Sequence, residues 1–166
     1  MADASGVVSL DADRAIVLSR VFDAPRDLVF DAWTHPDHIA EWWGPAGFEN
    51  TRVDVDLSVG GAFRILMRAP DASVHECAGV FLEIVRPERL VYEGDAAAGD
   101  ACGAGLPPKA RVTVTFEELA DGATRLTIDT RFLTPAARLA ARAGGFTKGW
   151  LEGLERLAAV ISERKA

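Results

Sequence analysis

Cysteine, tyrosine and histidine are scarce in this chain of 166 residues, and their scarcity excludes several kinds of site. The sequence holds two cysteines, one tyrosine and three histidines. Cys77 and Cys102 are too few for a disulfide framework or a cysteine-based metal motif. No apolar run approaches the roughly 20 residues that a membrane-spanning helix needs. The first residues also lack the pattern of a secretory signal, so we expect a cytoplasmic protein with free thiols.

Basic residues are outnumbered, which argues against nucleic acid as a partner. The chain has 18 Lys and Arg against 25 Asp and Glu, a formal net charge of -7, and phosphates would be repelled by it. The charge is uneven, because residues 131–166 carry +4 and the remainder -11. The basic C-terminal stretch is either a solvated helix face or a docking site for a protein partner. Both alternatives stay open, as does a homodimer.

The clearest periodic pattern lies in the last thirty residues. Apolar side chains recur there at steps of three or four, the spacing of one helix face: Phe146, Trp150, Leu154, Leu157 and Ile161. We expect helix from about Thr134 to Lys165, capped by Thr134 and interrupted at Gly144-Gly145. Glu152 and Arg156 fall on the opposite, polar side of this helix.

Upstream, the apolar residues mostly alternate with polar ones, as in β-strands. Strands are predicted over residues 14–22, 48–57, 62–68, 74–85, 90–93, 110–118 and 123–133. Gly60-Gly61 and Asp121-Gly122 are hairpin turns, so the sheet is antiparallel. Two short helices start near Pro25 and Pro36, because proline is favoured at the first helical position. Gly94–Lys109 is rich in Gly and Ala and is predicted to be a mobile loop, which could serve as a lid.

These elements predict an α+β fold with one domain. A curved antiparallel sheet wraps around the long C-terminal helix, and the two short helices after the first strand close one end. Residues 1–13 form a loose lead-in, and residues 14–166 form the domain. Such an arrangement leaves an apolar pocket between helix and sheet, the usual place for a small ligand.

Seven segments also carry a family resemblance. In chain order they are Val21–Pro25, Val29–Thr34, Trp42–Pro45, Val59–Phe63, Gly79–Ile84, Pro87–Val91 and Gly149-Trp150. Together they resemble the AHSA-like family (activator of Hsp90 ATPase homologue) of the START/Bet v 1-like SRPBCC superfamily. The resemblance implies a helix-grip fold with a hydrophobic cavity. Members of the superfamily bind lipids, polyketides and other apolar molecules, some are cyclases, and some act on chaperones.

The candidate ligand-binding residues are those expected to face the space between sheet and helix. They are Trp42, Trp43, Phe63, Ile65, Met67, His75, Phe81, Tyr92, Val114, Phe116, Ile128, Phe132, Trp150 and Leu154. Core packing alone is the alternative for the tryptophans and Tyr92, and a surface position at the end of a strand is the alternative for His75. No cofactor is expected, because no phosphate loop, dinucleotide motif or nucleophile elbow is present.

Candidates for acid–base chemistry are few. His75, Tyr92 and Glu76 lie on strands near the expected pocket, and any of them could serve as an acid–base group there. His35 and His38 have a spacing that could hold a metal, but Pro36 makes His35 a capping residue, and no third ligand is suitably spaced. We therefore expect no metal site.

Three functions remain. The first is non-catalytic binding of an apolar or aromatic small molecule in the cavity. The second is an enzyme like the polyketide cyclases and dehydratases, or a hydrolase, that uses the pocket His, Tyr or Glu. The third is a protein-interaction module related to chaperones or stress.

Overall fold

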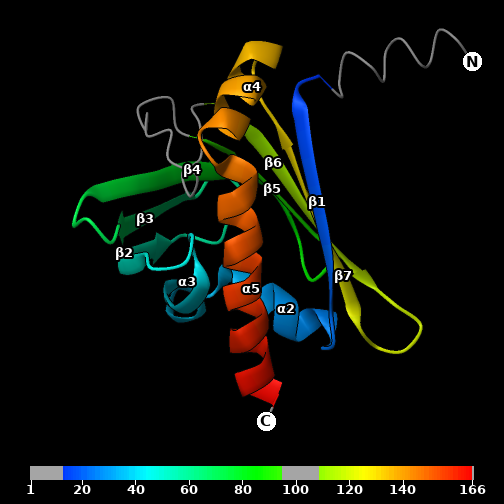
Figure 1. The fold of residues 1–166 in the computed structure, drawn as a ribbon. Helices are drawn as coiled ribbons and strands as arrows, with labels where there is room; N and C mark the ends of the chain where they lie inside the picture. The colour runs from blue at the N-terminus through cyan, green and yellow to red at the C-terminus, as the bar shows by residue number, and fades with distance from the viewer. Residues whose placement is uncertain (1–12, 95–108, 166) are drawn as a thin grey trace, which may run out of the picture.

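The chain folds into one seven-stranded antiparallel sheet with a long helix across one face (Figure 1). A computed structural model describes residues 13–94 and 109–165. The strands are β1 (Ala15–Phe22), β2 (Glu49–Val55), β3 (Ala62–Arg68), β4 (Val74–Val85), β5 (Arg89–Gly94), β6 (Arg111–Glu118) and β7 (Thr124–Arg131). Their order across the sheet is β1-β7-β6-β5-β4-β3-β2. The two edge strands, β1 and β2, are therefore neighbours in sequence but lie at opposite ends of the sheet.

The helices are α2 (Arg26–Thr34), α3 (Pro36–Trp42), α4 (Pro135–Ala143) and α5 (Phe146–Lys165). Figure 1 shows α5 lying along the sheet, with α4 continuing beyond one end and α2 and α3 near the other. The short helices α2 and α3 carry the chain from β1 to β2. This arrangement confirms the predicted helix-grip fold.

Local sequence signals begin and end α3 and α4 as predicted, whereas Pro25, predicted as the first helical residue, is the N-cap of α2 and no side chain caps that helix. His35 caps α3, since its Nδ1 accepts a hydrogen bond from the Asp37 backbone nitrogen at 3.2 Å. Thr134 caps α4 in the same way, accepting from the Ala137 nitrogen at 3.0 Å. Gly145 has a φ of +92°, a conformation open to glycine but rarely to other residues, and it separates α4 from α5.

Several predicted strand boundaries were too wide. The strand predicted over residues 48–57 extends to Leu57, but β2 ends at Val55 and Leu57 is 40% exposed. Phe132 and Leu133 lie beyond the end of β7. Leu57 follows the strand pattern in sequence, yet the chain turns toward Gly60 before it can pair. The predicted lead-in, Cys102 and most of the predicted 94–109 loop lie outside the described residues.

The apolar face of α5 supplies the centre of the core. All five residues of its predicted stripe are buried: Phe146, Trp150, Leu154, Leu157 and Ile161. They face the apolar inner side of the sheet, where Val112, Val114 and Ile128 are almost fully buried. Burying one such aliphatic side chain contributes about 1.5–3 kcal/mol. Within the described ranges, no helix is both long and apolar enough to cross a bilayer.

In contrast, α4 packs loosely. None of its residues is buried, and Leu139 on this helix is 59% exposed. One side chain ties it to the sheet, because Arg138 Nε donates to the Ala15 carbonyl at 3.0 Å. The predicted C-terminal helix is therefore two helices of different character, and only α5 builds the core.

We predict that His38 makes the fold less stable in mild acid. Burial, and then the charges of Arg164 and His35, lower the pKa of His38 from 6.5. Because the folded state favours the neutral ring, the unfolded state binds the proton more readily, and stability falls as the pH falls below 6.5. Between about pH 7 and about pH 5, His38→Gln should lose less stability than the unmodified chain in urea unfolding. Equal losses would contradict this role.

Candidate functional site

All four tryptophans of the chain gather in one cluster beside α5. Trp33 of α2 stacks on Trp150 of α5 with ring centroids 5.7 Å apart and planes 4° apart. Trp43 lies edge-on to Trp150 at 5.2 Å. Trp42 lies 4.8 Å from Trp33, and its indole nitrogen donates to the Ala32 carbonyl at 2.8 Å. Because such ring pairs stabilise one another beyond their burial, the cluster fixes α2 and α3 against α5.

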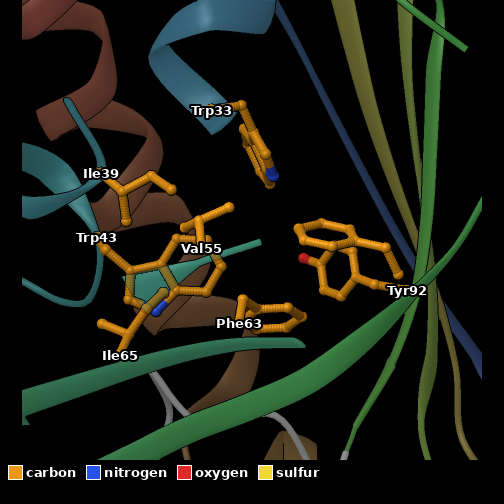
Figure 2. A pocket seen from close by; sticks show the side chains of 8 residues that line it. Trp33, Ile39, Trp43, Val55, Phe63, Ile65 and Tyr92 are labelled. Atoms are coloured by element: carbon orange, nitrogen blue, oxygen red, sulfur yellow. The ribbon is translucent and has the colours of Figure 1, made fainter. Parts of the chain in front are cut away.

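Next to this cluster is a small apolar cavity between the helices and the sheet (Figure 2). It is lined by Trp33, Ile39, Trp43, Val55, Phe63, Ile65, Phe81 and Tyr92. Its free space is about 20 Å³, close to what a single water molecule needs. The sequence predicted a ligand-sized pocket. The structure shows far less free space than that, because aromatic rings occupy most of it.

Closely packed aromatic rings on the sheet form one wall of the cavity. Phe63 packs against Phe81 at 5.3 Å and edge-on against Tyr92 at 5.1 Å. The Phe63 ring also lies over Gly79, where an added Cβ would come within 3.0 Å of two ring atoms. Gly79 thus leaves the room in which the Phe63 ring lies.

Two polar atoms of the cavity lining have no hydrogen-bond partner among the described residues. They are the hydroxyl oxygen of Tyr92 and the indole nitrogen of Trp43. Both side chains are buried, and Figure 2 shows the Tyr92 hydroxyl turned into the cavity. Burial first, and then the nearby Cys77, raise the pKa of Tyr92 well above its usual 10.0. Tyr92 is therefore a neutral hydroxyl, and its burial without a partner is unfavourable.

The loop after α3, which carries Trp43, is held by two side chains of α5. Arg156 Nη1 donates to the carbonyls of Trp43, Gly44 and Pro45 at 3.1, 3.0 and 2.9 Å. One turn earlier, Glu152 accepts from the Ala46 nitrogen at 3.1 Å. We call these contacts the Arg156 clamp. Partial burial lowers the pKa of Arg156, whereas the bond from Ala46 lowers that of Glu152.

The clamp requires α5 to come close to the loop. A Cβ on Gly153 would lie 3.4 Å from the Gly44 carbonyl oxygen, so the helix backbone itself approaches the loop here. The periodicity of the sequence assigned Arg156 to a solvated helix face. The structure corrects this, since its guanidinium satisfies carbonyls that follow the end of α3.

Some of the predicted binding residues line the cavity, and the rest pack elsewhere. Those in the lining are Trp43, Phe63, Ile65, Phe81 and Tyr92. Those buried in the surrounding core are Trp42, Met67, Val114, Phe116, Ile128, Phe132, Trp150 and Leu154. Sequence reasoning missed Trp33, Ile39 and Val55 as lining residues. Val55 falls within a predicted strand and Ile39 within the second predicted short helix, but nothing in the sequence pattern distinguishes cavity wall from core.

The three acid–base candidates are not brought together. Tyr92 is in the cavity, and its register partner on β4 is Phe81. His75 lies six residues further along β4, about 20 Å away at the usual rise of a strand, and contacts Ser73 Oγ at 2.9 Å. Glu76 points to the other face of β4 and pairs with Arg64. This geometry offers no joint acid–base action by the three.

The described residues provide no metal centre either, since none of them form a group of three or more His, Cys, Asp or Glu side chains. His35 and His38 stack on one another at 4.7 Å, and His35 is occupied as the α3 cap. A larger recess of about 480 Å³ lies over charged side chains at the ends of β5–β7. Its Arg111 and Lys109 pair with Glu93, and its Arg131 with Asp129.

The fold and its internal cavity define the class of protein. A long helix held in a curved antiparallel sheet is a helix-grip domain. Its cavity lies beside α2, α3 and the sheet, and none of the lining residues belongs to α5, whereas the sequence pattern placed the pocket between the C-terminal helix and the sheet. The chain belongs to the family of activator of Hsp90 ATPase homolog 1-like proteins, whose model matches residues 23–162. This family is part of the SRPBCC superfamily. Membership suggests a ligand-binding or chaperone-associated fold and specifies neither the ligand nor the partner.

Solved bacterial structures agree with this assignment. A protein from Nitrosomonas europaea superposes with a TM-score of 0.81 at 25% identity, covering 93% of this chain and 98% of that one. A protein from Chromobacterium violaceum is 30% identical, with a TM-score of 0.69 and coverage of 89% and 96%. One from Arthrobacter aurescens has a TM-score of 0.79 at 26% identity, covering 92% and 88%. No curated protein matches the sequence.

The Arg156 clamp yields a prediction of stability. Arg156→Met removes hydrogen bonds to three partly buried carbonyls and should lower the free energy of unfolding by about 2–4 kcal/mol. Arg164→Met is the matched control, since Arg164 lies on the same helix and pairs with exposed Glu41. It should change stability by less than about 1 kcal/mol. If both variants lose the same free energy of unfolding in urea, the clamp stabilises the fold no more than an exposed ion pair does.

The unpaired Tyr92 hydroxyl leads to a second prediction about stability. Tyr92→Phe removes a buried polar atom with no partner, so the ligand-free protein should become more stable by about 1 kcal/mol. The control is Thr124→Val, because the buried Thr124 hydroxyl donates to the Ala24 carbonyl at 2.7 Å. That variant should lose about 1–2 kcal/mol. A clear loss of stability in Tyr92→Phe would mean that the hydroxyl has a structural partner.

Proposed function

We propose that this protein binds a small apolar or aromatic molecule in the cavity between α3 and the sheet, without chemical conversion. The observation that supports this most is the pair of buried, unpartnered polar atoms in a lining that is otherwise apolar. Protein cores seldom leave such atoms unpaired, since each costs free energy. A bound molecule would offset that cost.

Binding requires the cavity to open. Its free space of about 20 Å³ is far below the roughly 300 Å³ of even small ligand pockets. The wall formed by Val55 and the loop after α3 is the part most able to move. Val55 is only partly buried, and it lies on β2, an edge strand of the sheet. Trp43 lies in the loop between α3 and β2, so displacing this loop would enlarge the cavity without breaking central sheet pairing, at the cost of the hydrogen bonds of the Arg156 clamp.

An enzyme of the cyclase or hydrolase kind is the less supported alternative. The cavity lining contains one titratable side chain, Tyr92. General acid–base catalysis needs a proton donor and acceptor within hydrogen-bond reach of the substrate. His75 and Glu76 are both remote from Tyr92, so a second group would have to come from elsewhere.

A protein-interaction role on the basic C-terminal region also has weak support. Several of its cations already contact the chain itself: Arg138 binds the Ala15 carbonyl, Arg156 the clamp carbonyls, Lys148 Glu152 and Arg164 Glu41. These side chains are less available to an acidic partner than the sequence indicated. The exposed apolar side chains of this region, Leu133, Leu139 and Leu151, are what favours a contact with another protein.

The proposal can be tested with α-methylstyrene as an apolar aromatic ligand. We expect it to shift the indole signals of Trp33 and Trp43 in ¹H–¹⁵N spectra. Val55→Phe should weaken this binding at least about tenfold, because the added ring takes up cavity space. Val21→Phe, on an exposed site of β1, is the control and should bind as the unmodified chain does. If α-methylstyrene fails to bind, or if Val55→Phe has no effect, the proposal is wrong.

A further inference from the structure

We infer that the cavity selects a neutral molecule that carries one hydrogen-bond acceptor, such as a ketone or ester carbonyl, on an otherwise apolar body. Tyr92 donates the hydrogen bond to that acceptor. This inference rests on the proposed function and names the class of ligand for the same cavity.

The acceptor requirement follows from the unpaired Tyr92 hydroxyl. A phenol hydroxyl has one proton to donate, and the rest of the lining is apolar, so an acceptor on the ligand is the group that can receive it. Figure 2 shows the Tyr92 hydroxyl directed toward the centre of the cavity rather than into the sheet. A site that buries an unpaired donor discriminates against ligands that cannot pair with it, because that donor then stays unsatisfied.

The requirement for a neutral ligand follows from the rest of the lining. None of the eight lining residues carries a charge. The guanidinium of Arg156, which contacts the loop that carries Trp43, is engaged by the carbonyls of Trp43, Gly44 and Pro45. A carboxylate or ammonium would lose its hydration in the cavity without gaining a partner of opposite charge, which is strongly unfavourable.

A buried water is the competing occupant. The free space of about 20 Å³ suits one water, and a water could accept from Tyr92. A carbonyl ligand would replace that water bond with an equivalent one, while its apolar body gains burial. An apolar ligand of the same shape would displace the water and leave Tyr92 unpaired. The two occupants therefore predict different preferences between matched ligands.

The test compares acetophenone with α-methylstyrene, which have nearly the same shape but carry C=O and C=CH₂ at the same position. Tyr92 is the chain's only tyrosine, so 3-fluorotyrosine labelling gives a ¹⁹F signal from this residue alone. We expect acetophenone to bind about tenfold more tightly than α-methylstyrene, the effect of one gained hydrogen bond. It should also shift the ¹⁹F signal more. Benzoate should not compete with either ligand near neutral pH.

Two variants assign the preference to Tyr92. In Tyr92→Phe, the ratio of the two affinities should fall to about one. Thr130→Val is the matched control, because the Thr130 hydroxyl is also buried without a partner but lies outside the cavity lining. It should keep the tenfold ratio.

Each outcome decides a separate point. If both ligands bind equally in the unmodified chain, the ligand class is wrong and the proposed function stands. If benzoate binds most tightly, the requirement for a neutral ligand is wrong. If neither acetophenone nor α-methylstyrene binds, both the inference and the proposed function fail. A ratio that Thr130→Val abolishes as completely as Tyr92→Phe does would mean that Tyr92 is not the group that recognises the ligand.

Discussion

The contact between Arg156 and the loop after α3 is the constraint on which the site depends. A helix that ends in the interior leaves carbonyls unpaired, and here a side chain from another helix satisfies three consecutive ones. The loop therefore has one favoured position relative to α5. Trp43 is part of that loop, so the same hydrogen bonds that join the helices also place one wall of the cavity. Stability and the shape of the site cannot be changed independently at this point.

Packing and hydrogen bonding make opposing contributions to the free energy of the cavity. Close packing of Trp33, Phe63 and Phe81 favours a filled space, since voids cost dispersion contacts. The unpaired hydroxyl of Tyr92 opposes it, because that atom gains only from a polar partner. A core optimised for packing alone would carry phenylalanine at this position. We therefore regard Tyr92 as the residue whose presence is best explained by binding rather than by folding.

The sequence predicted the fold well because its signals are local. Period-two alternation located the strands, Gly60-Gly61 and Asp121-Gly122 marked hairpins, and Thr134 marked a helix start. The site was harder, because alternation separates inward from outward residues and says nothing about depth. Phe63 and Met67 share one face of β3, yet only Phe63 reaches the cavity. The contacts of Arg156 could not be predicted either, because the carbonyls that it binds lie more than 100 residues away in the sequence.

The sheet order also has a consequence for synthesis on the ribosome. Strand β1 is made first but pairs only with β7, so Ile16 meets Thr130 when most of the chain has been translated. The hairpins from β2 to β5 pair with near neighbours and can form as they emerge, because short loops cost little closure entropy. During that interval β1 has no strand partner, and Ile16, Leu18 and Phe22 are uncovered. We expect the nascent chain to be most vulnerable to aggregation at this first strand.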